Sequence, residues 1–458
     1  MALKTILFLA AFIACSGGAL FAPIMGVLGY VALYNLGAER QWWFAPIRAL
    51  GLDLRCSLTL AVATGIGMAL HWRSLRYGKP FLHSQEKLLL VFLGLIWLST
   101  FVGEPTTGAY TLVDHPSVKM TKVIIFALML THIVTTVRRL DLLLWVLVVG
   151  SLAMGLQAYW TPYSEFTRGR IETIGGPDFT EANFLAAYLA AMLPVIGIQF
   201  LRTGWPGRLL CLFAGVFTTN AIILTRSRSS LVGVATGLLL AAILAPKQYR
   251  KVVIAGLIVA VAGGLYLMDP GFQERAATIT ASADERDASA ASRLVLADAA
   301  LNMLKDHPLG IGAGNFFQTI ERYDPSFKLK DVHNTFLRCA TELGVHGLLV
   351  FVALIANAAW SLRRTMKAAA GLPDDRRRDA TLLGYGLFIT VVTYLGCCFT
   401  ITLIYVEALW WLLALPVCLE RAVANLKTDA LLISGAKATM PVKTKVGSPF
   451  ALKGKRSG

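Results

Sequence analysis

Three polar stretches hold the residues of this chain that could do chemistry. The stretch "TRSRSSL" contains Arg226 and Arg228, "ASRLV" contains Arg293, and "DVHNTFL" contains His333. A guanidinium group can hold a phosphate through two parallel hydrogen bonds, which the ammonium group of lysine cannot copy. A neutral imidazole can take a proton from a hydroxyl group near physiological pH. The arginines are therefore candidates for binding a diphosphate, and His333 is a candidate general base.

Each of these residues also has an ordinary structural explanation. Arg226 and Arg228 could reach the membrane interface from the ends of a helical hairpin, and Arg293 could pair with an acidic side chain of the same loop. A single histidine near the start of a helix is more often structural than catalytic. Residue type and spacing leave both interpretations open, so the elements that carry these residues must decide between them.

The composition of the chain indicates a membrane protein. Of its 458 residues, 56% are hydrophobic and 15% are charged, and the mean hydropathy is +0.62. A soluble protein of this length rarely combines these values. Apolar runs of roughly 17 to 22 residues recur from end to end, and each can cross a hydrocarbon core about 30 Å thick as a helix. The predicted fold class is therefore an all-α polytopic membrane protein.

About twelve transmembrane helices are predicted. They lie near residues 5–34, 54–70, 86–102, 119–136, 140–158, 182–201, 208–225, 229–245, 251–268, 343–362, 381–401 and 404–421. The first stretch is interrupted by Gly17, Gly18 and Pro23 and could instead form two short helices, which would make thirteen and move the N-terminus to the other side. The predicted parts are residues 1–268 with nine spans, a loop at 269–342, residues 343–421 with three spans, and a basic, disordered tail at 422–458.

The basic residues predict the orientation of these spans. Lys and Arg are concentrated in alternate loops and in the C-terminal tail, so the positive-inside rule makes these parts cytoplasmic, together with both termini. The loops that contain Arg228, Arg293 and His333 then face the opposite, outer side. Because arginine is disfavoured on that side, the arginines that remain there need a reason, such as binding an anion.

Charge and cysteine content exclude two other classes of function. The net charge is +16, but the basic residues lie in short loops and in the tail. They fit topology signals and contacts with anionic membrane lipids better than nucleic-acid binding, so no nucleic-acid partner is expected. The seven cysteines lie mostly in apolar segments without CxxC spacing. Neither a metal site nor a disulfide is therefore expected.

The loop at 269–342 is predicted to carry structure of its own. Within "ASRLVLADAALNMLKDHP", four residues at helical spacing would form one apolar face: Leu294, Ala297, Leu301 and Leu304. Ser292 would cap the start of this helix and Pro308 would follow its end. We therefore predict an amphipathic helix along the outer membrane surface. Arg293 would lie at the start of this helix, where unpaired N–H groups also favour an anion.

The residues after this helix are predicted to form a glycine-rich turn, followed by the start of a membrane helix after His333. Three glycines in "HPLGIGAGNF" (307–316) allow tight backbone turns. They are a poor nucleotide-binding signature, because no strand precedes them and no Walker lysine follows them. His333 directly precedes a membrane helix that Asn334 can cap. Glu342, on the same short helix, could orient His333 or merely mark the membrane interface.

Taken in order, these motifs resemble the bacterial O-antigen ligase family and its relatives. The resemblance is carried by "TRSRSSL", by "ASRLVLADAALNMLKDHPLGIGAGNF" in a long outer loop, and by "HNTFLRCATELGVHG" leading into a late helix. The stretch "GGPDFTEANFLAAYLAAMLP" (175–194) also looks like a family feature, and Asn183 is its residue to carry over. Each motif is loose, but their order and spacing together are fairly specific.

The resemblance implies a twelve-span glycosyltransferase of the bacterial inner membrane, with its active site facing the periplasm. Its donor would be a glycan on undecaprenyl diphosphate, and its acceptor a sugar hydroxyl of lipid A-core oligosaccharide. The family is thought to need no metal ion and no cofactor. Arg228 and Arg293 would stabilise the charge of the leaving diphosphate, and His333 would deprotonate the acceptor. A single displacement would invert the anomeric centre.

Further residues would then bind the substrates. These are Arg226, Ser227, Asn183, Asn334, Glu342 and Asn315. Since Arg226 lies two residues from Arg228, it could also replace Arg228 as the essential arginine.

Three alternative functions stay open at this point. An O-antigen polymerase and a protein O-oligosaccharyltransferase share the donor and the leaving group, so only the acceptor would differ. A transporter of lipid-linked sugar would need internal repeats and polar residues across the bilayer. The polar residues of this chain gather at one face instead, which makes the transporter a distant alternative.

Overall fold

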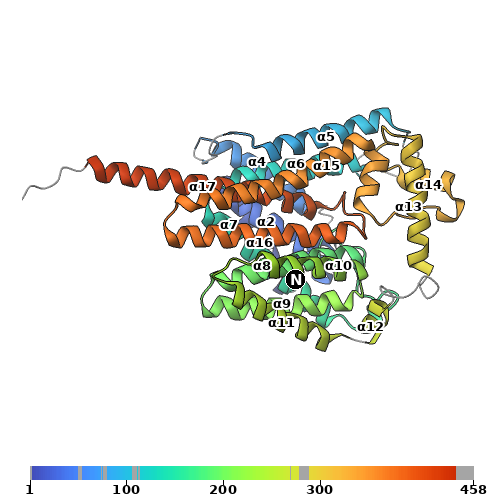
Figure 1. Cartoon of the computed structure of the whole chain (residues 1–458), viewed down its shortest axis with the longest axis horizontal. Coiled ribbons are helices and arrows are strands. Elements are labelled where there is room, and N and C mark those ends of the chain that lie inside the picture. Colours follow the sequence, from blue (N-terminus) through green and yellow to red (C-terminus); the bar gives the residue numbers. More distant parts are fainter. Residues whose placement is uncertain are drawn as a thin grey trace, which may run out of the picture.

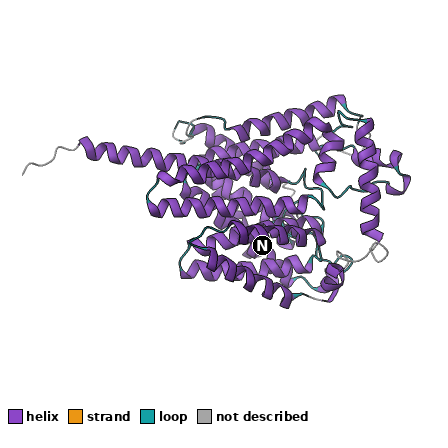
Figure 2. Cartoon of the chain, in the orientation of Figure 1, coloured by secondary structure: helices purple, strands orange, loops and turns teal. Residues whose placement is uncertain are grey.

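The computed structural model describes residues 3–439, except 50–53, 74, 76–79, 106–110, 112, 113, 269 and 278–287. Every regular element in these described ranges is a helix (Figure 2). Ten helices of the described residues are long and apolar enough to cross a membrane, and two further apolar helices, α4 and α10, are shorter. The chain is thus an all-α polytopic membrane protein, as predicted.

The α-helices follow one another with a helix at each predicted span. In chain order they are α1 (Leu3–Phe21), α2 (Pro23–Leu36), α3 (Ala45–Ala49), α4 (Cys56–Leu70), α5 (Ser84–Val102), α6 (Pro116–Ile133), α7 (Val137–Trp160), α8 (Ala182–Arg202), α9 (Trp205–Leu224), α10 (Arg228–Leu244), α11 (Arg250–Leu267), α12 (Pro270–Ala277), α13 (Ala288–Asp306), α14 (Phe316–Tyr323), α15 (Thr335–Ala368), α16 (Asp374–Cys398) and α17 (Glu407–Thr439). Most of the long helices run along the long axis of the molecule, whereas α13 crosses this direction at one end (Figure 1).

The first predicted span consists of two antiparallel helices. Ala22 is extended, with φ −140° and ψ 94°, and Pro23 begins α2 because proline fits the first turn of a helix but not its interior. A Cβ at Gly29 would lie 2.8 Å from that of Cys15, which places the two helices side by side. The Thr5 hydroxyl donates to the Trp43 carbonyl at 2.7 Å.

The N-terminal end of α1 therefore lies on the side of the bundle that holds the connections between α2 and α4. Arg40, in that connection, donates to the carbonyl oxygens of Gly176 and Pro177 between α7 and α8. Pro177 lines one cavity with Arg293 of α13, so these connections lie at the end crossed by α13. α17 projects from the opposite end (Figure 1). The structure thus has the two-helix arrangement that was the alternative, with the described start of the chain at Leu3 and its described end at Thr439 on opposite sides of the bundle. The orientation of the spans in a membrane stays a prediction.

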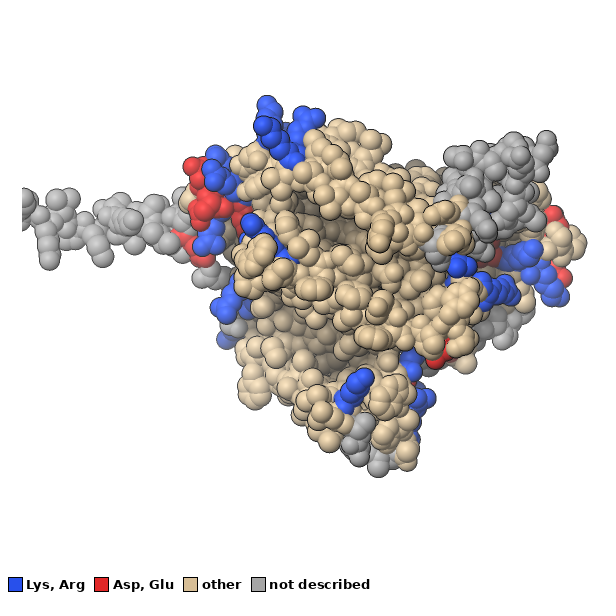
Figure 3. Space-filling model, turned by 90° about the horizontal axis from the view of Figure 1, so that it is seen from below, with Lys and Arg blue, Asp and Glu red and all other residues tan. Residues whose placement is uncertain are grey.

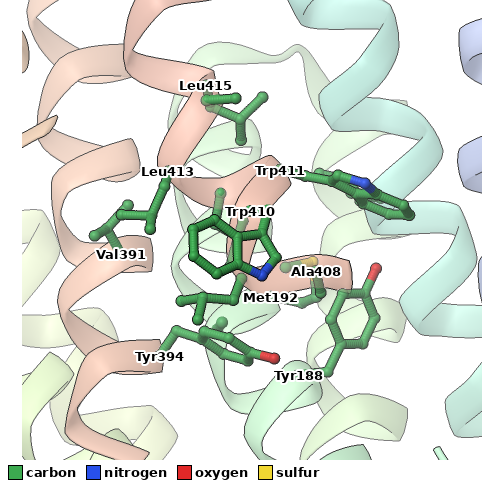
Figure 4. Packing of buried hydrophobic residues seen from close by; sticks show 14 of the residues in the cluster. Tyr188, Met192, Val391, Tyr394, Ala408, Trp410, Trp411, Leu413 and Leu415 are labelled. Atoms are coloured by element: carbon green, nitrogen blue, oxygen red, sulfur yellow. The ribbon is translucent and has the colours of Figure 1, made fainter. Parts of the chain in front are cut away.

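The core lies between α8, α16 and the first turns of α17. Trp410 is fully buried, and Trp411 packs with Tyr188 and Met192 from α8, while Tyr394 of α16 lies beside them (Figure 4). Such aromatic side chains bury large apolar areas. The connection between α16 and α17 is thereby held firmly at the end of the bundle that α13 crosses.

At that end, α13 packs on a small core of its own. Its buried residues are Leu296, Ala299, Ala300 and Met303, which contact Ile311, Phe316 and Ile320. Leu294 and Leu301, two residues of the predicted apolar face, are 64% and 44% exposed and therefore point away from this small core. A helix along a membrane surface presents an exposed apolar face of this kind, so contact of this face with the membrane stays a prediction. α13 has apolar residues on two faces, and the face that is buried is the one that packs against α14. Its first residue is Ala288, so Ser292 lies inside the helix and does not cap it.

The turn at Gly310, Gly312 and Gly314, called the glycine turn below, packs against a break in α15. Gly344 has φ 75° and ψ 178°, which separates a short first segment of α15 from the membrane helix. The N–H groups of Ile311 and Gly312 donate to the carbonyl oxygens of Thr341 and Glu342 at 2.9 and 3.0 Å. The turn therefore satisfies carbonyl groups that the break leaves without helical partners. This confirms the prediction of tight turns at these glycines.

The last helix extends further than predicted. α17 continues to Thr439, so residues 422–439 are helical where a disordered tail was expected, and residues 440–458 lie outside the described residues. The stretch "RAVANLKTDALL" is rich in residues with high helix propensity, which explains the extension. Most charged side chains visible in Figure 3 lie toward the two ends of the long axis, with a largely uncharged surface between them. That distribution suits a chain that crosses a membrane.

Candidate active site

A cavity of about 500 Å³ lies between α13, α14 and the adjoining ends of the membrane helices. Its walls come from α6, from the segment between α7 and α8, from α13, and from the first turn of α15 with the loop before it. The connection between α16 and α17 closes another side. Most of its lining is therefore supplied by segments far apart in the sequence. The ionisable side chains in its wall are Lys119, Asp178, Glu181, Arg293, Lys330, Asp331, His333, Arg338 and Tyr405.

His333 lies in the wall of this cavity, in a strained backbone conformation. Its φ is 50°, a region that histidine adopts more often than most residues but still rarely. One third of the side chain is exposed. Burial lowers the pKa of His333 below its usual value of 6.5, Arg293 lowers it further, and Asp331 acts in the opposite direction. The imidazole is therefore mainly neutral at pH 7 and can accept a proton.

Arg293 lines the same cavity as His333. Because both side chains line this cavity, α13 brings the two residues together across a separation of forty positions in the sequence. Because α13 begins at Ala288, Arg293 lies in the second turn and not at the helix N-terminus. The unpaired N–H groups of a helix start therefore do not support an anion at Arg293, and the guanidinium alone provides the positive charge.

Two residues that the sequence analysis missed, Asp331 and Arg338, complete this part of the wall. Arg338 is 2% exposed, and its Nη1 donates to Asp331 Oδ1 at 2.8 Å. Asp331 Oδ2 lies 3.7 Å from Nδ1 of His333. The spacing of Arg338 and Glu342, four residues apart on one helix, is a sequence signal for the ion pair between them.

Glu342 does not contact His333, so the predicted orienting role is wrong. Its Oε1 accepts from Arg338 Nε at 2.7 Å and from the Phe316 N–H at 3.1 Å, and its Oε2 accepts from the Tyr405 hydroxyl. The side chain is fully buried. Glu342 therefore joins α14, α15 and the connection to α17 into one framework, and the carboxylate beside His333 is that of Asp331.

Arg226, Ser227, Arg228 and Asn183 form a neighbouring cluster that does not line the cavity. Ser227 is the residue before α10 and donates from its hydroxyl to Asn183 Oδ1 at 2.9 Å. Arg170, which the sequence analysis missed, donates to the same Asn183 oxygen at 2.7 Å. This cluster adjoins the cavity through α8, because Glu181 and Phe184 line the cavity on either side of Asn183.

Arg226 and Arg228 have different positions in this cluster. Arg226 has φ 48°, and a Cβ at Gly271 would lie 2.5 Å from its guanidinium carbon. Its guanidinium thus packs against α12 and against the turn at Gly169. Arg228 is the first residue of α10, where the positive end of the helix adds to its own charge.

The comparison with family models matches the segment that contains most of these residues. Residues 213–352 match the family described as O-Antigen ligase (Wzy_C). This segment belongs to the O-antigen ligase superfamily. The members of this superfamily are membrane glycosyltransferases, and the match therefore supports an enzymatic function for this chain at that coarse level. No curated protein matches the chain.

The O-antigen ligase segment includes both parts of the candidate site. Eight of the nine predicted site residues lie within it, and Asn183 lies before it. Besides Glu342, two more of the eight have structural roles in the described contacts. Asn334 caps α15 by accepting from the N–H groups of Phe336 and Leu337 at 2.9 and 3.0 Å. Asn315 donates to the Glu104 carbonyl at 2.6 Å and so fixes the glycine turn.

The cavity wall also contains an ion pair from outside the O-antigen ligase segment. Lys119 Nζ lies 2.5 Å from Asp178 Oδ1, and Asp178 Oδ2 accepts from the Tyr34 hydroxyl and from the Glu407 N–H at 2.9 and 2.8 Å. Asp178 is therefore fully engaged with α2, α6 and α17. This arrangement anchors the segment between α7 and α8 against the bundle, and it gives that side of the cavity a fixed shape.

Proposed function

We propose that this membrane glycosyltransferase moves a glycan from undecaprenyl diphosphate to a sugar hydroxyl of lipid A-core, at the periplasmic side of the bacterial inner membrane. The single observation that carries the proposal is that His333 and Arg293 line one cavity. A base and a phosphate-binding cation are the two groups that glycan transfer from a lipid diphosphate requires. The cavity lies at the ends of the membrane helices, where a lipid-linked donor and a membrane-anchored acceptor can meet.

The proposed reaction is a single displacement at the anomeric carbon. The acceptor oxygen attacks this carbon while His333 takes its proton, and the bond to the diphosphate breaks with its electron pair remaining on the diphosphate. Arg293 stabilises the negative charge that builds up on the leaving group, because a guanidinium in an enclosed site interacts with a phosphate more strongly than in water. Arg228, at the start of α10 in the adjoining cluster, supplies a second positive charge for the extended diphosphate lipid.

The first experiment replaces the proposed base. His333→Ala is expressed in a strain that lacks the chromosomal gene, at a level matched to the parent protein. We expect glycan transfer to fall roughly 10²- to 10⁴-fold, with the ladder of long lipopolysaccharide lost and free core remaining. The matched control is His346→Ala, because His346 lies beyond the break in α15 and outside the cavity lining.

A His333→Ala protein that makes both the ladder and glycoprotein at the parent rate would remove His333 as the base. The same strains distinguish the alternative acceptors, because the donor chemistry is common to all of them. Core that carries a single repeat would identify a polymerase, and loss of glycoprotein with an intact ladder would identify a protein ligase.

A further inference from the structure

The carboxylate of Asp331 has different partners on its two oxygens. Oδ1 accepts a hydrogen bond from Arg338 Nη1 at 2.8 Å. Oδ2 accepts from the backbone N–H of His333 at 3.3 Å and lies 3.7 Å from the Nδ1 atom of its ring. One carboxylate thus joins a buried guanidinium to the proposed base. The backbone bond also helps to hold His333 at its unusual φ of 50°.

Arg338, which binds Asp331, is itself held in place by several contacts. Its Nε donates to Glu342 at 2.7 Å while Nη1 donates to Asp331, so the guanidinium is bound from two sides. Its central carbon lies 4.8 and 4.2 Å from the ring centroids of Phe316 and Phe317. A charged group this deeply buried is stable only when its partners stay in place. Rotation of Asp331 away from Arg338 would leave the guanidinium without one of its two carboxylates.

Capping of α15 does not explain this arrangement. Asn334 already accepts from the N–H groups of Phe336 and Leu337 and so caps the helix. Glu342 already ties the helix to α14 through the Phe316 N–H. The additional carboxylate lies in the cavity wall directly beside the imidazole, and it is partly exposed there, with a relative exposure of 16%.

We propose that Asp331, held by Arg338, is the positioning residue of His333: it selects the imidazole tautomer with the proton on Nδ1 and leaves Nε2 to take the proton of the acceptor. The inference rests on the proposed role of His333 as the base. During transfer the acceptor proton moves to Nε2, and the oxygen forms its new bond to the anomeric carbon. Asp331 stabilises the imidazolium that results. The distance of 3.7 Å is expected to shorten as this charge develops, as hydrogen bonds in substrate-free active sites often do.

The sign of the expected pH effect follows from the groups that face His333. Besides Asp331, the ionisable residues of the cavity wall are Lys119, Asp178, Glu181, Arg293, Lys330 and Arg338, with Tyr405. Burial and Arg293 lower the pKa of His333, and Asp331 raises it. Replacing Asp331 by asparagine removes the effect that raises the pKa and keeps those that lower it. The pKa of His333 therefore falls further in that variant, and the acidic limb of the pH–rate profile moves to lower pH.

The test measures the titration of His333 separately from catalysis. The full-length protein in membrane vesicles is treated with diethyl pyrocarbonate over a range of pH, and modification of the His333 peptide is followed by mass spectrometry. For Asp331→Asn we expect the pKa of His333 to fall by about one unit. The rate of glycan transfer should fall roughly 10²-fold or more, as in other enzymes that lose the carboxylate behind a catalytic histidine. Asp298→Asn, a neutralised exposed carboxylate on α13, is the matched control and should change neither quantity.

A conservative variant keeps the test decisive if Asp331→Asn does not accumulate. Asp331→Glu retains the charge beside Arg338 and His333 but displaces it by one methylene, so transfer should be intermediate between those of the parent and of His333→Ala. An unchanged titration of His333 in Asp331→Asn would overturn the inference, and where that variant does not accumulate, a parent rate of transfer in Asp331→Glu would overturn it. Failure of the proposed function is seen separately, as normal transfer by His333→Ala.

Discussion

The cavity around His333 and the cluster around Asn183 lie at the same end of the molecule, and both contain arginines, but they are built differently. In the cavity wall, Arg338 is bound between two carboxylates and fixes the groups around His333. In the cluster, the described hydrogen bonds of Asn183 come from a hydroxyl and from Arg170, and they connect α8 to the start of α10. An arginine held by carboxylates has its charge neutralised and serves as a support. The arginines proposed to bind the diphosphate are Arg293, which lines the cavity, and Arg228, which begins α10.

The largest effect is expected at Arg293, the candidate phosphate-binding arginine that lines the cavity. Arg293→Ala should lower the initial rate of glycan transfer roughly 10³-fold, which is the range found when a group that stabilises transition-state charge is removed. Arg293→Lys should restore only part of this rate, since an ammonium cannot bind a phosphate through two parallel bonds. The rate is measured in vesicles with a lipid-diphosphate-linked donor.

The control for Arg293 is Lys305→Ala, which removes an exposed cation from the same helix. If the rate of glycan transfer by Arg293→Ala stayed within threefold of the parent rate, the diphosphate would not lie in the cavity. The proposal that the cavity, and not the Asn183 cluster alone, binds the diphosphate would then be wrong.

A smaller but distinct effect is expected within the Asn183 cluster. Arg228→Ala should lower transfer roughly 10²-fold, because it removes a full charge from the start of α10. Arg226→Ala should cost less than tenfold, because its guanidinium packs against Gly271 and Gly169 and acts as a support. The two variants are compared at equal expression in the lipopolysaccharide ladder assay. Loss of the ladder in Arg226→Ala with a normal ladder in Arg228→Ala would reverse the assignment.

The smallest effect concerns the stability of the cavity wall. Gly344→Ala should lower the free energy of unfolding by about 1–3 kcal/mol, because its φ is 75° and an added Cβ would lie 2.6 Å from the carbonyl carbon of Leu309. The melting temperature of the detergent-solubilised protein measures this. Gly371→Ala is the control, since its added Cβ would meet no atom within 4 Å. Equal melting temperatures for the two variants would mean that the break in α15 is not under strain.

Several features follow from the sequence because they depend on neighbouring residues. The apolar runs determine the membrane helices, and the residue before α15 determines its cap, since Asn334 bonds to N–H groups two and three positions away. The glycines of "HPLGIGAGNF" determine tight turns, with φ values of 92°, 100° and 87° at Gly310, Gly312 and Gly314. Such local patterns predicted the fold class, the positions of most helices and the location of His333 directly before a membrane helix.

Other features could not be decided from the sequence because two local structures are about equally compatible with it. α13 has apolar residues on both faces, so its sequence alone does not choose which face is buried, and the contacts with α14 decide. The chain around Pro23 permits either a kinked span or a hairpin, and packing of α1 and α2 selects the hairpin. Glu342 was close enough to His333 along the chain to orient it, but its helix turns the carboxylate toward Arg338 and Tyr405.

The sequence by itself predicted a helical membrane protein with His333 and several arginines at the same end of its bundle. The tertiary structure alone decided which of them meet. Arg293 and His333 belong to segments forty residues apart, and they share a cavity only because α13 crosses the ends of the membrane helices. The partnership of Asp331 and Arg338 likewise depends on burial, which makes a charge require a fixed counter-charge. Burial is a property of the packed chain, so no local pattern of residues determines it.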